Sequence, residues 1–148
     1  MVPPNQTLIL EKIDTVMRCL SRVSEKTPAT LHDFENDLDR QDIVILNLER
    51  AIQACVDIAA HIVAYSNLPV PSTMSDAFEK LASAQILSRK TADQMKKTIG
   101  LRNILVHEYQ KIDWTILWQM ITGHLDDFHS FVTEIQTATT HPEKSKNP

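Results

Sequence analysis

The scarcity of chain-breaking residues constrains the fold of this sequence more than any other feature. Only two glycines occur, and the prolines lie at positions 3, 4, 28, 69, 71, 142 and 148. The stretches between these positions are long and contain nothing that would interrupt a helix. No Asn-Gly, Asp-Gly or Gly-Gly pair marks a β-hairpin, and no stretch alternates cleanly between apolar and polar residues. The sequence therefore predicts an all-α protein.

Apolar residues recur at helical spacing along most of the chain. This pattern predicts long helices over residues 5–26, 39–67, 88–107 and 113–137, a shorter helix over 75–84, and a short helical turn within 30–37. Short connections between long helices favour an up-and-down bundle of four to five helices. We expect a single helical domain over residues 1–138 and a disordered tail over 139–148.

Composition limits the class of protein. A chain of 148 residues, 43% hydrophobic and 23% charged, suits one soluble domain with a sizeable core. No apolar run is long enough to span a bilayer, and the first residues do not resemble a signal peptide, so we expect a cytoplasmic protein without membrane contact. Cys19 and Cys55 both lie in apolar periodic segments, which favours reduced core thiols over a disulfide or a metal pair.

Charge is distributed unevenly. The net charge of −4 argues against bulk, non-specific binding of nucleic acid but leaves room for a local basic site. Such a site is indicated in the predicted helix 88–107, where one acidic residue, Asp93, is outnumbered by five cations. These cations are Arg89, Lys90, Lys96, Lys97 and Arg102.

The end of that helix carries an unusual set of polar residues. In the stretch LRNILVHEYQKID, residues 101–113, Arg102, Asn103, His107 and Tyr109 interrupt a segment that otherwise reads as core. An imidazole can take a proton from a ribose 2′-hydroxyl or give one to a leaving 5′-oxygen. A guanidinium group binds phosphate and stabilises extra charge on its oxygens. These residue types suggest a phosphodiester-cutting site that requires no metal, although a lone histidine at a helix end is more often a capping or solvated residue.

A helical projection refines the assignment. Ala92, Met95, Ile99 and Val106 fall on a core stripe. Arg89, Lys96, Asn103 and His107 share a neighbouring stripe, which makes Arg89 and Lys96 candidates for RNA phosphate contacts and Asn103 a candidate to orient His107 or bind phosphate. Arg102 lies about 140° from His107 by the helix period. The two side chains can reach one phosphate only if the helix loosens near Gly100 or its polar exit, or if the arginine side chain bends round. A twofold pairing of this helix would also bring four such side chains into one cleft.

Other polar residues fit a site less well. Glu49 and Asp57 could orient the imidazole, but charges on helices are usually solvated. The segment HLDDFH, residues 124–129, places two histidines five positions apart, which is not the one-turn spacing that chelates a metal well. Trp114 and Trp118 lie on a predicted core stripe, where packing is favoured over stacking on RNA bases.

The stretch RNILVHEY, residues 102–109, matches the Arg-x4-His-x-Tyr motif of the HEPN superfamily, and the sequence most resembles the HepT-like toxins of HEPN/MNT toxin–antitoxin pairs. The segment DRQDIVILNLERAIQACVDIAAHI resembles that family's long second helix. TADQMKKTIGLRNILVHEY resembles its motif helix, and HLDDFHSFVTEI resembles its last helix. The resemblance covers about residues 5–137.

The resemblance implies a helical homodimer whose motif helices meet at a shared cleft. It implies a metal-independent endoribonuclease that cuts transfer RNA or messenger RNA, needs no cofactor, and has Arg102 and His107 as its catalytic pair. Asn103 would be the polar residue that commonly follows the arginine. Tyr109 would be the tyrosine to which an MNT-type nucleotidyltransferase antitoxin adds AMP. Two alternatives remain open: a non-catalytic HEPN-like module that binds nucleotide or a partner, and a helical dimer whose motif residues only stabilise the interface.

Overall fold

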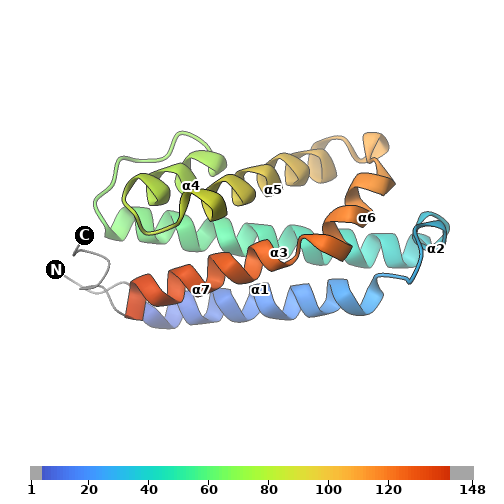
Figure 1. Cartoon of the computed structure of the whole chain (residues 1–148), viewed down its shortest axis with the longest axis horizontal. Coiled ribbons are helices and arrows are strands. Elements are labelled where there is room, and N and C mark those ends of the chain that lie inside the picture. The colour runs from blue at the N-terminus through green and yellow to red at the C-terminus, as the bar shows by residue number, and fades with distance from the viewer. Residues whose placement is uncertain (1–4, 141–148) are drawn as a thin grey trace.

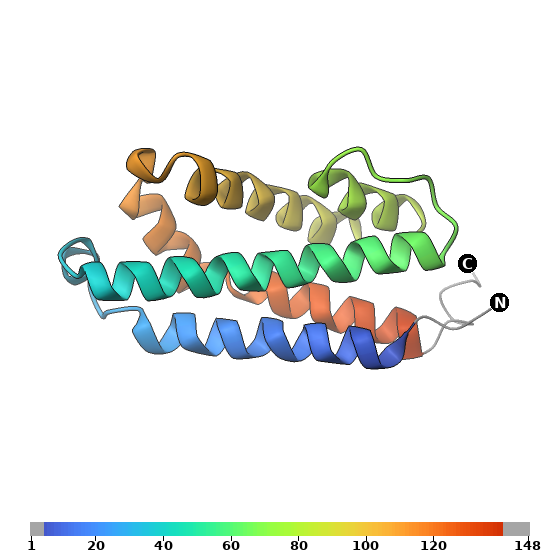
Figure 2. The same ribbon diagram turned by 180° about the vertical axis from the view of Figure 1, so that it is seen from behind.

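The computed structural model describes residues 5–140, and every regular element in that range is a helix (Figure 1). The elements are α1 (Gln6–Lys26), α2 (Leu31–Glu35), α3 (Leu38–Tyr65), α4 (Met74–Ser83), α5 (Arg89–His107), a 3-10 turn η1 (Tyr109–Lys111), α6 (Trp114–Gly123) and α7 (Asp126–Thr140). The predicted all-α class is confirmed. The four long helices α1, α3, α5 and α7 run up and down beside one another, and the short helices lie in the connections (Figures 1 and 2).

The helices begin where short polar side chains can cap them. The Asn5 side chain accepts a hydrogen bond from the backbone N–H of Leu8 at 3.0 Å, and Asp113 accepts from Ile116 in the same way at 3.2 Å. These caps lie at the starts predicted for α1 and α6. α4 begins at Met74, one residue earlier than predicted, because Thr73 is its cap.

The predicted single helix over residues 113–137 is wrong, because the chain forms α6 and α7 instead. α6 ends at Gly123, His124 caps it, and α7 starts at Asp126. The break changes the direction of the chain, so that α6 packs against α2 while α7 packs against α5. A straight helix would bring its apolar side chains to only one of these two places.

The end of the domain also differs from the prediction. α7 continues through Thr140, two residues past the expected boundary at 138. Thr139 is buried, and its hydroxyl donates to the carbonyl of Ile135 at 2.9 Å, so it belongs to the packed helix. The rest of the predicted disordered tail, residues 141–148, lies outside the described residues.

The core surrounds α3, which is buried on more of its circumference than the other helices. Two aromatic contacts tie the short helices to it. Phe34 of α2 meets Trp114 of α6 edge to face, with ring centroids 5.6 Å apart, and Phe78 of α4 meets Phe131 of α7 at the same distance. These contacts agree with a packing role for Trp114. Cys19 and Cys55 are buried free thiols, as predicted.

No helix in the described range combines the length and the apolar character needed to cross a membrane. Only α1, α3 and α5 reach 19 residues or more, and each carries many charged side chains.

Candidate active site

The two halves of α5 lie in different environments. Thr91, Ala92, Met95, Thr98 and Ile99 are buried in the first part of the helix, whereas Leu105 is the one fully buried residue of its last two turns. Ile104 is 38% exposed and Val106 is 41% exposed, which corrects the prediction that Val106 belongs to the core. The end of α5 therefore offers an apolar surface as well as its polar side chains.

The motif residues lie on this open end. Arg102 is half-buried, and Asn103 and His107 are exposed. Among the described residues, none of these three side chains has a hydrogen bond or ion pair to another part of the chain. Their donors and acceptors are therefore available to a ligand or a second molecule. Tyr109 begins η1 directly after the helix, and its side chain lies outside the described part of the structure.

The chain does not loosen before His107. Gly100 is exposed inside α5, and a Cβ built there would meet no atom within 4 Å, so neither packing nor an unusual backbone angle requires glycine within this chain. The helix stays regular up to His107 and ends only at Glu108. Arg102 and His107 are thus held about 140° apart, and one copy of the chain does not bring them into direct contact.

Arg89 and Lys96, predicted to contact RNA, are engaged elsewhere. The Arg89 guanidinium donates to the two carboxylate oxygens of Glu79 on α4, at 2.8 Å and 2.6 Å, and the Lys96 ammonium donates to the same carboxylate. Arg89 also pairs with Asp93 at 3.3 Å. Hydrogen bonds from Arg89 and Lys96 lower the pKa of Glu79 to about 2. Contact of these two cations with RNA therefore stays a prediction. In the structure, both cations join α5 to α4 through Glu79.

A second carboxylate fixes the start of α5. Glu134 of α7 accepts from the backbone N–H of Ser88 at 2.5 Å and from the hydroxyl groups of Ser88 and Thr91. A negative charge is favourable at this position, because the N-terminus of a helix carries partial positive charge. No pattern in the sequence marks Glu79 or Glu134, since neither lies in a motif and Glu134 is 46 positions from Ser88.

The remaining candidates have other partners. Asp57 accepts from Lys12 of α1 and from Gln53, both at 2.9 Å, so it joins α1 to α3. His61, a further histidine of α3 for which packing or surface exposure is expected rather than catalysis, accepts from the backbone N–H of Asn5 at 3.2 Å. Within residues 5–140, no three His, Cys, Asp or Glu side chains cluster closely enough to hold a metal ion.

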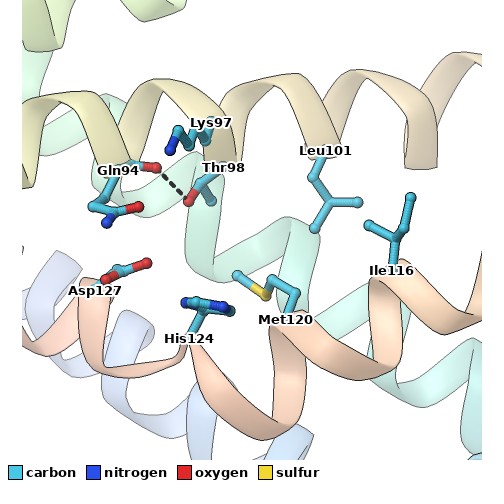
Figure 3. A pocket seen from close by; sticks show the side chains of 8 residues that line it. All are labelled: Gln94, Lys97, Thr98, Leu101, Ile116, Met120, His124 and Asp127. Carbon is cyan, nitrogen blue, oxygen red and sulfur yellow. Dashed lines mark hydrogen bonds between the residues drawn. The ribbon is translucent and has the colours of Figure 1, made fainter.

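A depression of about 320 Å³ lies beside α5, between that helix and the α6–α7 junction (Figure 3). Its lining comprises Gln94, Lys97, Thr98, Leu101, Ile116, Met120, His124 and Asp127. Thr98 and His107 are nine positions apart, which places them on opposite sides of the helix. This depression therefore lies on the side of α5 away from His107, whereas Arg102, one turn after Thr98, lies on the side of the depression.

Comparison with known proteins identifies the class. A family model described as "Ribonuclease HepT-like" matches residues 16–135. The chain belongs to this family of HepT-like ribonucleases.

Two named relatives and one solved structure cover nearly the whole chain. A protein named mRNA nuclease HepT, from Shewanella oneidensis, is 38% identical over 129 residues, which are 87% of this chain and 96% of that protein. A protein named tRNA nuclease HepT, from Aphanizomenon flos-aquae, is 29% identical over 130 residues, which are 88% of this chain and 88% of that protein. A structure described as the tri-AMPylated Shewanella oneidensis HEPN toxin in complex with MNT antitoxin is similar with a TM-score of 0.82 at 38% identity, over 87% of this chain and 96% of that chain. These similarities confirm the predicted family and fold.

The Glu79 cluster predicts a dependence of stability on pH. Because the folded pKa of about 2 lies below the usual value of 4.5, ionised Glu79 stabilises the fold above pH 4.5, and this contribution is lost as the pH falls toward 2. We expect Glu79→Gln to lower the melting temperature at pH 7, and the difference from wild type to shrink between pH 4.5 and 2. Circular dichroism melts at several pH values measure this. Glu11→Gln, at an exposed glutamate with no ion pair among the described residues, is the control; an equal effect there contradicts the interpretation.

Proposed function

We propose that this chain is the toxin of a HEPN/MNT toxin–antitoxin pair and a metal-independent endoribonuclease that cuts transfer RNA or messenger RNA. The observation that carries the proposal is the open end of α5, where Arg102, Asn103 and His107 are all free of partners among the described residues. These residues form the motif of a family named for ribonucleases. The relatives named mRNA nuclease and tRNA nuclease support the choice of RNA as substrate.

The residue types suit cleavage by internal transfer. In this mechanism His107 accepts the proton of a ribose 2′-hydroxyl, and the 2′-oxygen attacks the adjacent phosphorus. The bond from phosphorus to the 5′-oxygen of the next nucleotide breaks, and that oxygen takes up a proton, either from a protonated histidine or from water. Arg102 stabilises the extra negative charge on the phosphate oxygens as the new bond forms. The products are a 2′,3′-cyclic phosphate and a free 5′-hydroxyl, and no metal is needed to balance the step.

The site we propose is completed by a second copy of the chain. Arg102 and His107 are about 140° apart on one regular helix, so we place the ends of two α5 helices together around a shared phosphate. Ile104 and Val106 supply partly exposed apolar surface for such a contact. Gly100 adds no side chain on the exposed face one turn before Ile104, which permits close approach of another backbone.

A second candidate function follows from the same geometry. Because Arg102 and His107 do not meet within one chain, the end of α5 could serve only to bind a nucleotide or an MNT partner. Such a module would keep its affinity for the partner but would leave RNA intact.

Regulation by the antitoxin is the last part of the proposal. The related Shewanella toxin is described as AMPylated and in complex with its MNT antitoxin. In this chain the equivalent target is Tyr109, two positions after His107. AMP added there would place a bulky anion beside the phosphate site, and it would repel RNA and fill the cleft.

The catalytic assignment is tested by substitution. Loss of a general base costs about 10²–10⁴-fold in rate, and loss of one charge-stabilising donor costs about 10²–10³-fold. His107→Ala and Arg102→Ala are therefore each expected to reduce cleavage of total RNA at least about 100-fold. The assay contains EDTA, and wild-type cleavage is expected to continue in its presence. His129→Ala, at an exposed histidine of α7, is the control. Full activity of His107→Ala would exclude this mechanism, and a stable complex with the antitoxin but no cleavage by wild type would favour the binding module.

The composite site has its own test. If each site takes Arg102 from one subunit and His107 from the other, mixing the two inactive variants produces dimers with one intact site and one doubly damaged site. After unfolding and refolding together, the mixture is expected to regain about a quarter of wild-type cleavage, since half the dimers are mixed and each has one working site. Separately refolded variants are the control. A mixture as inactive as its components shows that both residues must come from the same chain.

Modification is tested by mass spectrometry. Incubation of the protein with its MNT partner, ATP and Mg²⁺ is expected to add the mass of one or more AMP groups to the wild-type chain and none to Tyr109→Phe. Tyr65→Phe, at the end of α3, controls for general loss of a phenol. AMP addition that persists in Tyr109→Phe would place the modification elsewhere and refute this assignment.

A further inference from the structure

Three arginines gather in a depression on the other side of the bundle from α5. The depression measures about 700 Å³, lies between α1 and α3, and is lined by Arg18 and Arg22 of α1 and Arg50 of α3. The polar residues that join them in the lining are Thr15, Ser21 and Asn47. No carboxylate belongs to the lining, although acidic residues outnumber basic ones 19 to 15 in the sequence. The Thr15 hydroxyl and the Asn47 amide already donate to the carbonyls of Glu11 and Ile43, so the guanidinium groups are the main phosphate-binding groups of this depression.

A neighbouring depression gives the contrast. The one beside α2 contains a single arginine, Arg40, together with Asp33 and Asp37. Arg40 pairs with Asp37 at 3.3 Å and donates to the carbonyl of Lys26 at 3.2 Å. The carboxylate that pairs with Arg40 therefore lines the same depression, whereas the carboxylates that pair with Arg18 and Arg22 lie outside the lining of the α1–α3 depression.

The guanidinium groups of the α1–α3 depression are accessible. The side chain of Arg18 is 72% exposed and that of Arg22 is 48% exposed, and their ion pairs to Asp14 and Glu25 lie on the same helix. Exposed pairs of this kind contribute little and are screened by salt, so a polyanion can displace them. Arg50 has no ion pair among the described residues.

The arginines also converge on one place. Arg18 and Arg22 are one helical turn apart on α1, and Arg50 reaches the same region from the antiparallel α3. Burial raises the pKa of the Cys19 thiol, and the positive charges of Arg50 and Arg18 oppose that increase, so both cations act on the same buried atom. This convergence makes the depression a single cationic surface.

We propose that Arg18, Arg22 and Arg50 bind the phosphate backbone of the RNA substrate at a surface separate from the cleaving residues. The inference rests on the proposed ribonuclease function. RNA is favoured over a small anion because the depression is broad and open, and no aromatic residue lines it for stacking, which indicates backbone contacts rather than base recognition. We assign the phosphate contacts to these three arginines rather than to Arg89 and Lys96, because Glu79 forms ion pairs with both of those cations.

The surface lies along the bundle rather than at its tip, since Arg50 is near the middle of α3 and Arg18 and Arg22 are in the second half of α1. The end of α1, the beginning of α3 and the end of α5 gather at the same end of the bundle (Figure 2). RNA that runs along the bundle from a phosphate held at the end of α5 would therefore meet this second contact region. Because phosphate contacts release counterions, this region would set affinity and its dependence on salt without touching the reacting atoms.

The test measures RNA binding by the full-length chain in a His107→Ala background, so that the labelled single-stranded RNA stays intact. The triple variant Arg18→Gln, Arg22→Gln, Arg50→Gln is expected to bind at least about tenfold more weakly at low salt. Each lost phosphate contact removes about 0.7 from the slope of log K against log salt, so the slope should fall by about 2. Arg40→Gln is the matched control and should leave Kd and slope unchanged. In the active background, the triple substitution should raise KM and leave kcat unchanged.

The outcomes separate this inference from the proposed function. If wild type neither binds nor cuts RNA, the proposed function fails and this inference fails with it. If wild type cuts RNA while the triple variant keeps the wild-type Kd and salt slope, only this inference fails. Weakened binding of the antitoxin with unchanged RNA affinity would assign the surface to a protein contact and also overturn it. Circular dichroism checks that the variants fold. If the triple variant does not fold, the single variants Arg50→Gln and Arg50→Lys are compared. Only Arg50→Gln should lower the slope of log K against log salt.

Discussion

Two glutamates from other helices hold the first turns of α5 in position. The helix has an excess of positive charge, and Glu79 from α4 and Glu134 from α7 supply the opposite charge at its first turns. Together with the buried Met95 and Ile99, they fix the helix along its first half. The second half can then extend to the surface without losing its position. A reactive group on such a helix is better positioned than one on a loop, because the backbone beneath it is held by packing.

The sequence predicted the helices well because the signals for them are local. Asn5, Ser88 and Asp113 cap the helices that start beside them, and prolines mark the connections. The break between α6 and α7 was missed for the opposite reason. Ile121, Leu125 and Phe128 keep helical spacing through the break, so periodicity indicates one continuous helix. What decides the break is where the two halves find their partners, α2 for one and α5 for the other, and no pattern within the segment contains that information.

The candidate site shows the same limit. A helical projection groups Arg89 and Lys96 with His107, and on an isolated helix all three would face a ligand together. The projection cannot show that Glu79, from a different helix, takes both cations. Nor can it show the surface made by Arg18, Arg22 and Arg50, because that surface exists only once α1 and α3 are antiparallel and in register. Motif residues were found because their spacing lies within one helix, whereas ion pairs and shared surfaces between helices depend on the tertiary fold.

If the cleaving residues and the binding surface lie on different helices, one part of the protein performs the chemistry and another supplies the affinity for RNA. The end of α5 offers few groups, and its half-buried arginine and exposed histidine are too far apart to grip a phosphate alone. Binding energy for a long polyanion must then come from residues outside the end of α5. Cations that contact only the phosphate backbone of RNA supply this energy without selecting a base sequence. Under this arrangement one modification near His107 would block the cleaving residues and repel RNA from them, while the arginines on α1 and α3 kept their own phosphate contacts. The modified form would then lose more in cleavage than it loses in affinity for RNA.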